Sequence, residues 1–95
     1  MTKVKINWLP ITDKYIASQS DFSLQKQCLP KDETKKLAYG LYSEYENKKV
    51  ELIFTSENKW VGFFFVNKEF LEKKEFVGAI TARRNAKHWL QLESI

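Results

Sequence analysis

A short run of aromatic residues constrains the fold of this chain more than any other feature. The segment WVGFFFV, which begins at Trp60, contains no charged side chain. Because side chains alternate across an extended strand, Trp60 and Phe64 face one side of it, and Phe63 and Phe65 face the other. Both faces are therefore apolar, which is typical of an interior strand covered on both sides. We predict such a strand here, and we expect residues 12–30 of the same chain to cover its second face.

Other segments of the chain show the alternation of half-buried strands, and short polar stretches between them predict turns. Their spacing of roughly ten residues is typical of an antiparallel meander. The predicted strands are KVKINWL (3–9), KVELIFT (49–55), FVGAITA (76–82) and HWLQLES (88–94). The predicted turns are ENKK (46–49), SENK (56–59) and RRNAK (83–87), and NKEFLEKKE (67–75) is a polar connection with room for a single helical turn.

The first third of the chain lacks clean alternation and predicts one or two short helices. Thr12 or Asp13 can cap the first of them. Ser20 or Asp21 can cap a second that runs to about Cys28, shortly before a proline. These helices are the elements that we expect to pack on one face of the sheet.

The segment 33–47 fits two interpretations. Leu37, Leu41 and Tyr45 have helical spacing. Gly40 and the tyrosines of this segment suit a strand better than a helix. Periodicity alone leaves both readings open, and we favour the strand.

The composition agrees with one small folded domain over residues 1–95. Apolar residues make up 43% of the chain and aromatic residues 15%, which is too much for a disordered segment. We predict an α+β fold, in which one or two short helices from the N-terminal third pack on one face of an antiparallel meander of about five strands. The alternative is a small all-β barrel closed by the N-terminal strand.

The aromatic strand also resembles a known binding motif. Gly62–Val66 is similar to the centre of the RNP1 segment of RNA-recognition-motif domains, whose first and third aromatic residues stack on bases. The resemblance implies an aromatic platform at Phe63 and Phe65. Val61 stands where that motif has a basic residue, and Phe64 stands where it has glycine or alanine. Because the similarity covers so short a stretch, we do not assign the chain to that family.

The sequence contains no set of residues that predicts catalysis, a metal site or a cofactor. Its one histidine, His88, belongs to an alternating strand pattern, and its one cysteine, Cys28, reads as a small buried residue. A zinc site needs more Cys and His ligands than this chain has, and its glycines do not form a phosphate-binding loop. We therefore expect no enzyme. The lone cysteine and the absence of a signal or transmembrane pattern predict a cytoplasmic protein that does not contact a membrane.

The most basic part of the chain is the best candidate for binding a partner. Net charge is +4, and no acidic residue occurs between Glu75 and Glu93. If RRNAK forms a hairpin turn, its cations project together beside an aromatic residue, a combination that suits a carboxylate-rich surface or a phosphate. The candidate partner-binding residues are Arg83, Arg84, Lys87, His88 and Trp89.

These observations favour a non-enzymatic protein-binding module of the inhibitor, immunity or phage-accessory type, which acts by occluding a larger protein. The alternative is a small basic nucleic-acid-binding protein that uses the Arg83–Trp89 turn with Phe63 and Phe65 as stacking groups. The lysines are scattered and mostly lie near acidic residues, a pattern that permits an anionic partner without requiring one. Whether the chain is a monomer or a homodimer is left open.

Overall fold

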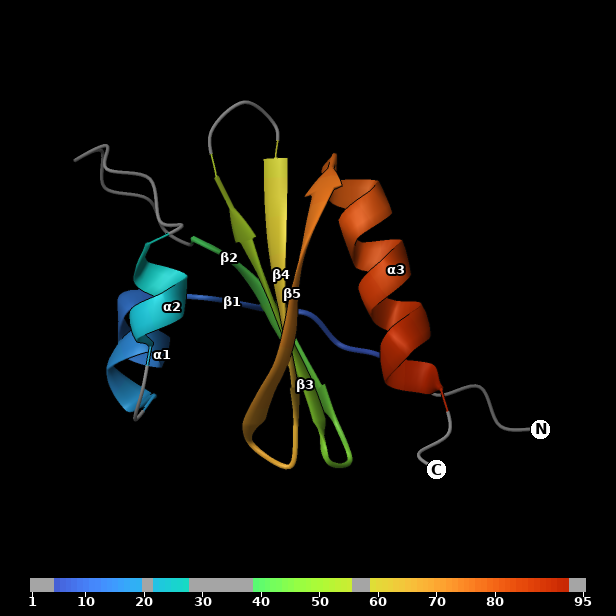
Figure 1. The fold of residues 1–95 in the computed structure, drawn as a ribbon, viewed down its shortest axis with the longest axis horizontal. Coiled ribbons are helices and arrows are strands. Elements are labelled where there is room, and N and C mark those ends of the chain that lie inside the picture. The colour runs from blue at the N-terminus through green and yellow to red at the C-terminus, as the bar shows by residue number, and fades with distance from the viewer. Residues whose placement is uncertain (1–4, 20–21, 28–38, 56–58, 93–95) are drawn as a thin grey trace.

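The protein has three layers, and its β-sheet is the middle one (Figure 1). The computed structural model describes residues 5–19, 22–27, 39–55 and 59–92. Helices α1 and α2 lie on one face of the sheet, and α3 lies on the other. The elements are β1 (Leu9–Pro10), α1 (Asp13–Ser18), α2 (Ser23–Lys26), β2 (Gly40–Tyr45), β3 (Lys48–Phe54), β4 (Lys59–Val66), β5 (Glu69–Val77) and α3 (Ala79–Gln91).

The sheet is an antiparallel meander in the order β1-β2-β3-β4-β5. This confirms the predicted α+β class and the predicted meander with short N-terminal helices. Strands β1 and β5 lie at opposite edges of the described sheet, which is not closed. The alternative of a small barrel is therefore wrong.

Strand β4 is an interior strand, as its two apolar faces predict. It pairs with β3 on one side and with β5 on the other. Phe63 packs with Tyr15 and Phe22 from the α1–α2 side, and Phe64 packs with residues of α3. Phe63 and Phe64 are each only 1% exposed. The described parts of the predicted segment 12–30, residues 12–19 and 22–27, supply this cover, as predicted.

The C-terminal part of the sequence prediction is wrong. In place of the predicted strands at 76–82 and 88–94 and the predicted turn at 83–87, the described residues form the end of β5 and the single helix α3, and residues 93 and 94 lie outside them. Gly78, at a φ of 89°, separates the two elements with a backbone conformation that favours glycine. Beyond it, an apolar stripe at helical spacing faces the sheet. The fully buried residues of that stripe are Ala82, Ala86 and Leu90.

The polar connection predicted at 67–75 is also wrong, because most of it is strand β5. Asn67 and Lys68 have φ values of 53° and 68°, the left-handed conformations of a tight two-residue hairpin turn. A register shift at Phe64 and Phe65 gives β5 an extra residue, Leu71, with no partner in β4. The charged side chains that led to the prediction of a connection belong to an exposed edge strand. Charge at such an edge discourages pairing with a strand of another molecule.

The ambiguous segment 33–47 contains strand β2, so the preference for a strand is confirmed over Gly40–Tyr45. Residues 33–38 lie outside the described part of the chain. Glu46, at a φ of 56°, lies in the turn that leads into β3, so the turn is shorter than the four residues predicted.

The first helix begins where the sequence predicts, because Thr12 is its N-cap and accepts a hydrogen bond from the Tyr15 amide at 3.2 Å. Helix α2 is shorter than expected, and its predicted caps and end (Ser20, Asp21 and Cys28) lie outside the described residues.

Of the predicted first strand at 3–9, the structure describes residues 5–9, and among these only Leu9 belongs to β1, which it forms with Pro10. The predicted alternation nevertheless holds in the described residues before them. Ile6 and Trp8 pack against the core on the α3 side, whereas Lys5 and Asn7 are exposed.

Candidate functional site

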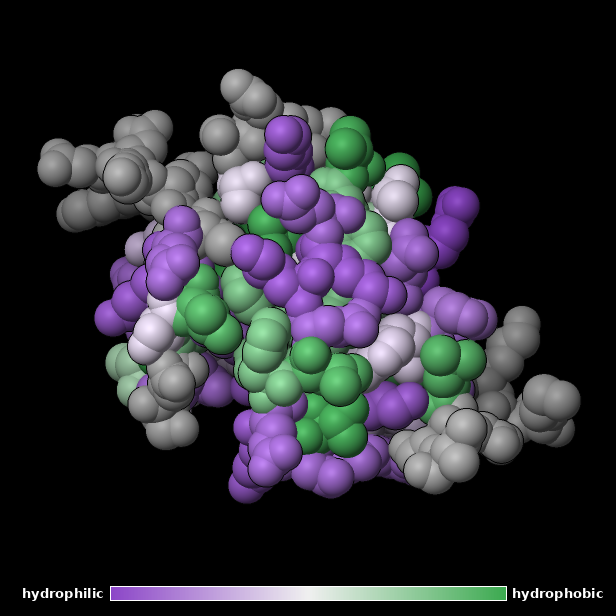
Figure 2. Space-filling view, in the orientation of Figure 1, coloured by the Kyte–Doolittle hydropathy of each residue, from purple (hydrophilic) through white to green (hydrophobic). Residues whose placement is uncertain are grey.

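Helix α3 presents a basic surface that contains no acidic residue. Residues three or four positions apart lie on the same side of a helix, so Ile80, Arg84, Lys87 and Gln91 form one outward line. Arg83 lies beside this line, and all of these side chains are exposed. Figure 2 shows mainly hydrophilic surface over α3, with hydrophobic residues near the end at which β5 leads into it.

The structure keeps most of the predicted partner-binding residues together, but on a helix instead of a hairpin turn. Arg83, Arg84, Lys87 and His88 are exposed on α3. Trp89 is not on this surface. It packs under the helix, with its ring edge-on to Phe64 at a centroid distance of 5.0 Å. The structure therefore separates Trp89 from the other candidates and places it in the core.

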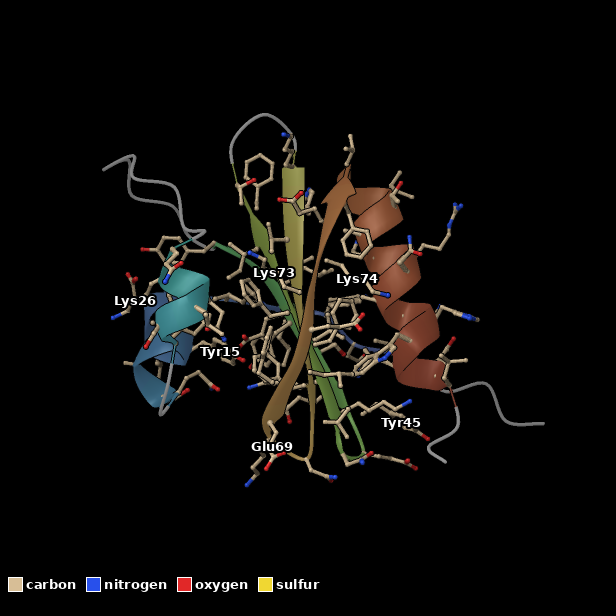
Figure 3. All side chains as sticks on the ribbon, in the orientation of Figure 1. Tyr15, Lys26, Tyr45, Glu69, Lys73 and Lys74 are labelled. Carbon is tan, nitrogen blue, oxygen red and sulfur yellow. The ribbon has the colours of Figure 1, made fainter. Side chains whose placement is uncertain are left out.

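Lysine 74 extends the positive surface from α3 toward strand β5. Figure 3 shows its side chain between β5 and α3, and its Nζ lies 5.6 Å from the centre of the Phe64 ring. The same Nζ lies 3.0 Å from the Oε1 atom of Glu72. Because the Glu72 carboxylate offsets the charge of Lys74, this lysine adds less net positive charge to the surface than the arginines do.

An aromatic platform on the sheet is not available in the folded chain. The Phe63 ring is buried under Tyr15 and Phe22, so it has no free face for a base. Phe65 is half-buried, and the Lys49 ammonium lies 4.7 Å from the centre of its ring. The stacking role that the RNP1 resemblance implies is therefore wrong for Phe63, and for Phe65 the lysine occupies the ring face.

A buried polar cluster around Glu51 was not found from the sequence. Glu51 lies in β3 and is 0% exposed. Tyr15 of α1 donates its hydroxyl to Oε2, and Gln25 of α2 donates its Nε2 to Oε1 at 2.6 Å. Lys49 adds a cation 3.8 Å from Oε2. The cluster thus ties both N-terminal helices to the middle strand of the sheet (Tyr15 in Figure 3).

The chemistry of this cluster is structural. Burial, together with the hydrogen bond and the charge of Glu51, raises the pKa of Tyr15 far above its ordinary value. The tyrosine therefore keeps its proton and donates a hydrogen bond to the Glu51 carboxylate. Because Glu51 has no access to solvent and both of its oxygens accept hydrogen bonds, it is not placed to take a proton from a substrate.

Within the described residues, no group of three or more His, Cys, Asp or Glu side chains is arranged to hold a metal ion. His88 is exposed on α3, and Cys28 lies outside the described part of the chain, so their pairing is not tested. No helix in the described ranges is long and apolar enough to span a bilayer.

Comparison of this chain with protein families, with curated proteins and with solved structures gave no match.

Proposed function

We propose that this chain is a non-enzymatic protein-binding module that occludes an acidic surface of a larger protein with the exposed side of α3. An inhibitor, an immunity protein or a phage accessory protein acts in this way. The observation that carries the proposal is the group Arg83, Arg84 and Lys87, which project from one helix that has no acidic residue.

The helix is held firmly enough to act as a binding surface. Ala82, Ala86 and Leu90 are fully buried against the sheet. Their spacing places the cations on the opposite side, at the fixed intervals of a regular helix. A surface that is already ordered loses less entropy on binding than a flexible loop does.

The exposed apolar residues beside the cations favour a protein partner. Val77 is 69% exposed at the end of β5, and Ile80 is 67% exposed in the first turn of α3. Protein interfaces combine an apolar centre with arginine and a polar rim. A partner that carries an apolar recess bordered by Asp or Glu fits this arrangement. The guanidinium groups of Arg83 and Arg84 suit paired hydrogen bonds to those carboxylates.

A nucleic acid is the second candidate for the same surface. The absence of acidic residues on α3 favours phosphate contacts by Arg83, Arg84 and Lys87. The exposed aliphatic side chains of Val77 and Ile80 have no role in such contacts. The buried Phe63 removes the stacking group on which this alternative partly depended.

The proposal is tested with a photoreactive amino acid at Ile80 in the full chain. Irradiation in an extract of the source organism at physiological salt should cross-link one partner, which is then purified and titrated. The variant Arg83→Ala, Arg84→Ala, Lys87→Ala should bind that partner about a hundredfold more weakly, equivalent to about 2.7 kcal/mol. The matched control Lys14→Ala, Lys26→Ala, Lys73→Ala loses the same charge from exposed positions outside α3 and should bind like the unmodified chain.

Oligonucleotides decide between the two candidates. Binding to single- or double-stranded oligonucleotides that weakens steeply with salt, and that depends on the three α3 cations, would assign the surface to nucleic acid. If neither a protein complex nor oligonucleotide binding depends on Arg83, Arg84 and Lys87, both functions are wrong.

A further inference from the structure

On the face of the molecule opposite α3, a groove runs between α2 and the ends of the two hairpins β2–β3 and β4–β5. Its volume is about 620 Å³, within the range of sites that bind small molecules. Hydrophobic residues lie over α2 and over the lower ends of β4 and β5 in Figure 2. The groove is lined by Gln19, Leu24, Gln25, Glu44, Glu46, Asn47, Lys48, Lys49, Phe65, Asn67, Lys68 and Phe70.

Most residues that line the groove are polar, but three apolar side chains in its walls, Leu24, Phe65 and Phe70, are incompletely covered. Leu24 of α2 is 49% exposed, and Phe70 of β5 is 45% exposed. Phe65 lies next to Phe70, with a distance of 5.9 Å between the ring centres. An apolar group placed between Leu24 and Phe70 removes both side chains from water, which is the usual driving force at a small-molecule site.

A partly buried cation lies among these apolar side chains. The Lys49 Nζ donates a hydrogen bond of 3.0 Å to Gln19 and lies over the Phe65 ring. Its distance of 3.8 Å to Glu51 is that of an ion pair and exceeds a hydrogen bond. Because an ammonium has three donors, Lys49 keeps the capacity to donate to an acceptor in the groove. Glu51 already accepts hydrogen bonds from Tyr15 and Gln25.

Three cations (Lys48, Lys49 and Lys68) and two acids (Glu44 and Glu46) line the groove, which leaves a net charge of +1. The Lys48 ammonium already donates hydrogen bonds to the carbonyl oxygens of Trp89 and Leu92, and Lys68 is exposed, so Lys49 is the partly buried cation beside the apolar side chains.

A net charge of +1 favours a ligand with a single negative charge, because Glu44 and Glu46 repel a further anionic group. A polyanion such as an oligonucleotide does not fit this pattern. A cationic group of a ligand placed against Phe65 would lie beside the Lys49 ammonium, which repels it. The combination that remains is one carboxylate attached to an apolar body.

We infer that the groove between α2 and the β4–β5 hairpin binds a small apolar monoanion, with its carboxylate on Lys49 and its body between Leu24 and Phe70. None of the exposed cations of α3 lines this groove, so the site does not depend on the partner proposed for that helix.

The inference is tested with decanoate as the probe, followed by two-dimensional amide NMR spectra of the full chain. Decanoate should bind saturably and shift the amide signals of Leu24, Lys49 and Phe70 while those of α3 stay in place. The variant Lys49→Met should bind decanoate about tenfold more weakly or worse, because a charge-assisted hydrogen bond is lost. Binding of the neutral analogue decan-1-ol should be unchanged. The control Lys26→Met removes an exposed lysine that does not line the groove and should leave both affinities unchanged.

A second variant keeps the test decisive if Lys49→Met fails to fold. Phe70→Asp places a negative charge in the wall at an exposed position and should abolish decanoate binding. Absence of saturable binding, binding that shifts α3 instead, or equal affinities for Lys49→Met and Lys26→Met would overturn the inference. Saturable binding of a polyanion, such as heparin, in the same groove would also overturn it.

Discussion

The two covers of the sheet are built by different means, although they protect adjacent residues of the same strand. On one face, the 13-residue helix α3 packs Ala82, Ala86 and Leu90 in an apolar cluster with Phe64. The polar ties there are hydrogen bonds from Lys48 to the carbonyl oxygens of Trp89 and Leu92, at the end of the helix. On the other face, α1 and α2 have 6 and 4 residues. Helices this short are not stable in water without tertiary contacts. In this protein the buried Glu51 carboxylate supplies part of those tertiary contacts.

This difference shows what each cover requires from the sequence. The α3 cover needs small residues at helical spacing so that the helix can approach the sheet closely. The α1–α2 cover needs a specific polar partner, because Glu51 bonds side chains from both helices at once. Removing one member of such a cluster leaves the others buried without their hydrogen bonds. We therefore expect the two faces to respond differently to matched substitutions.

The largest expected effect is that of truncating the phenylalanine on the α3 side. Phe64→Ala should lower the free energy of unfolding by about 3–5 kcal/mol, because removal of the ring leaves a cavity that the well-packed apolar core fills only partly. Phe63→Ala is the matched change, since Phe63 is equally buried and is its neighbour in β4. It should cost less, because two short helices can move into the space more easily than α3 can.

Urea denaturation of the two variants measures this difference directly. An equal loss for both, or a larger loss for Phe63→Ala, would show that the α1–α2 cover is packed as rigidly as the α3 cover.

Strands β3 and β4 were predictable because their signals are local, whereas most of β5 was predicted as a polar connection. The alternation of WVGFFFV placed Phe63 and Phe64 on opposite faces, and both are buried there. The C-terminal helix was not predictable in the same way. Its buried stripe consists largely of the small residues Ala82 and Ala86, and the short run His88, Leu90, Leu92 also fits strand alternation. This segment therefore matches both the helical period and the strand period of two residues, and the match to the strand period led to the wrong prediction.

The candidate surface was found from sequence only in part. The acid-free run identified Arg83, Arg84 and Lys87, because neighbours in sequence remain close in any local structure. Trp89 was misplaced, because on a helix it falls three residues after Ala86 and faces the sheet. The Glu51 cluster joins residues 36 and 26 positions apart, so no local pattern reveals it.

The next effect, of about 3 kcal/mol, is expected from breaking the Glu51 cluster. Glu51→Ala leaves the Tyr15 hydroxyl and the Gln25 amide without their shared acceptor, and it removes the ion-pair partner of Lys49. Amide hydrogen exchange should accelerate in α1 before it changes in α3, because only the former is tied to the carboxylate.

An exposed acid in the neighbouring strand is the control for this variant. Glu44→Ala should change the free energy of unfolding by less than about 0.5 kcal/mol and leave hydrogen exchange in α1 unchanged. Uniform acceleration across both covers in Glu51→Ala would mean that the cluster supports the whole fold and not the α1–α2 side alone.

A smaller effect should appear at alkaline pH. Burial and the neighbouring carboxylate raise the pKa of Tyr15, so the folded chain keeps a proton that the unfolded chain releases above about pH 10. The unfolded state then binds fewer protons, and stability should fall by about 1.4 kcal/mol for each pH unit above that point. Below pH 10 this contribution is constant.

Tyr15→Phe should remove most of this alkaline loss, as urea denaturation at a series of pH values would show. Tyr39 is the comparison, because its hydrogen bond to Asp13 also raises its pKa, but at an exposed position. Tyr39→Phe should change the slope much less, since solvent screens that interaction. A slope unchanged by Tyr15→Phe would show that another group governs alkaline unfolding.

The smallest effect that still separates the two covers comes from the start of α1. Thr12→Ala removes the side-chain oxygen that accepts from the Tyr15 amide and should cost about 1 kcal/mol. Because a helix of 6 residues has little other local support, the loss should appear as faster hydrogen exchange in α1. Helix α3 has no side-chain cap to lose, since Gly78 precedes it, and its protection should stay unchanged. Faster exchange in α3 on Thr12→Ala would mean that the two covers unfold as one unit across the sheet, and that the contrast between them concerns their chemistry and not their stability.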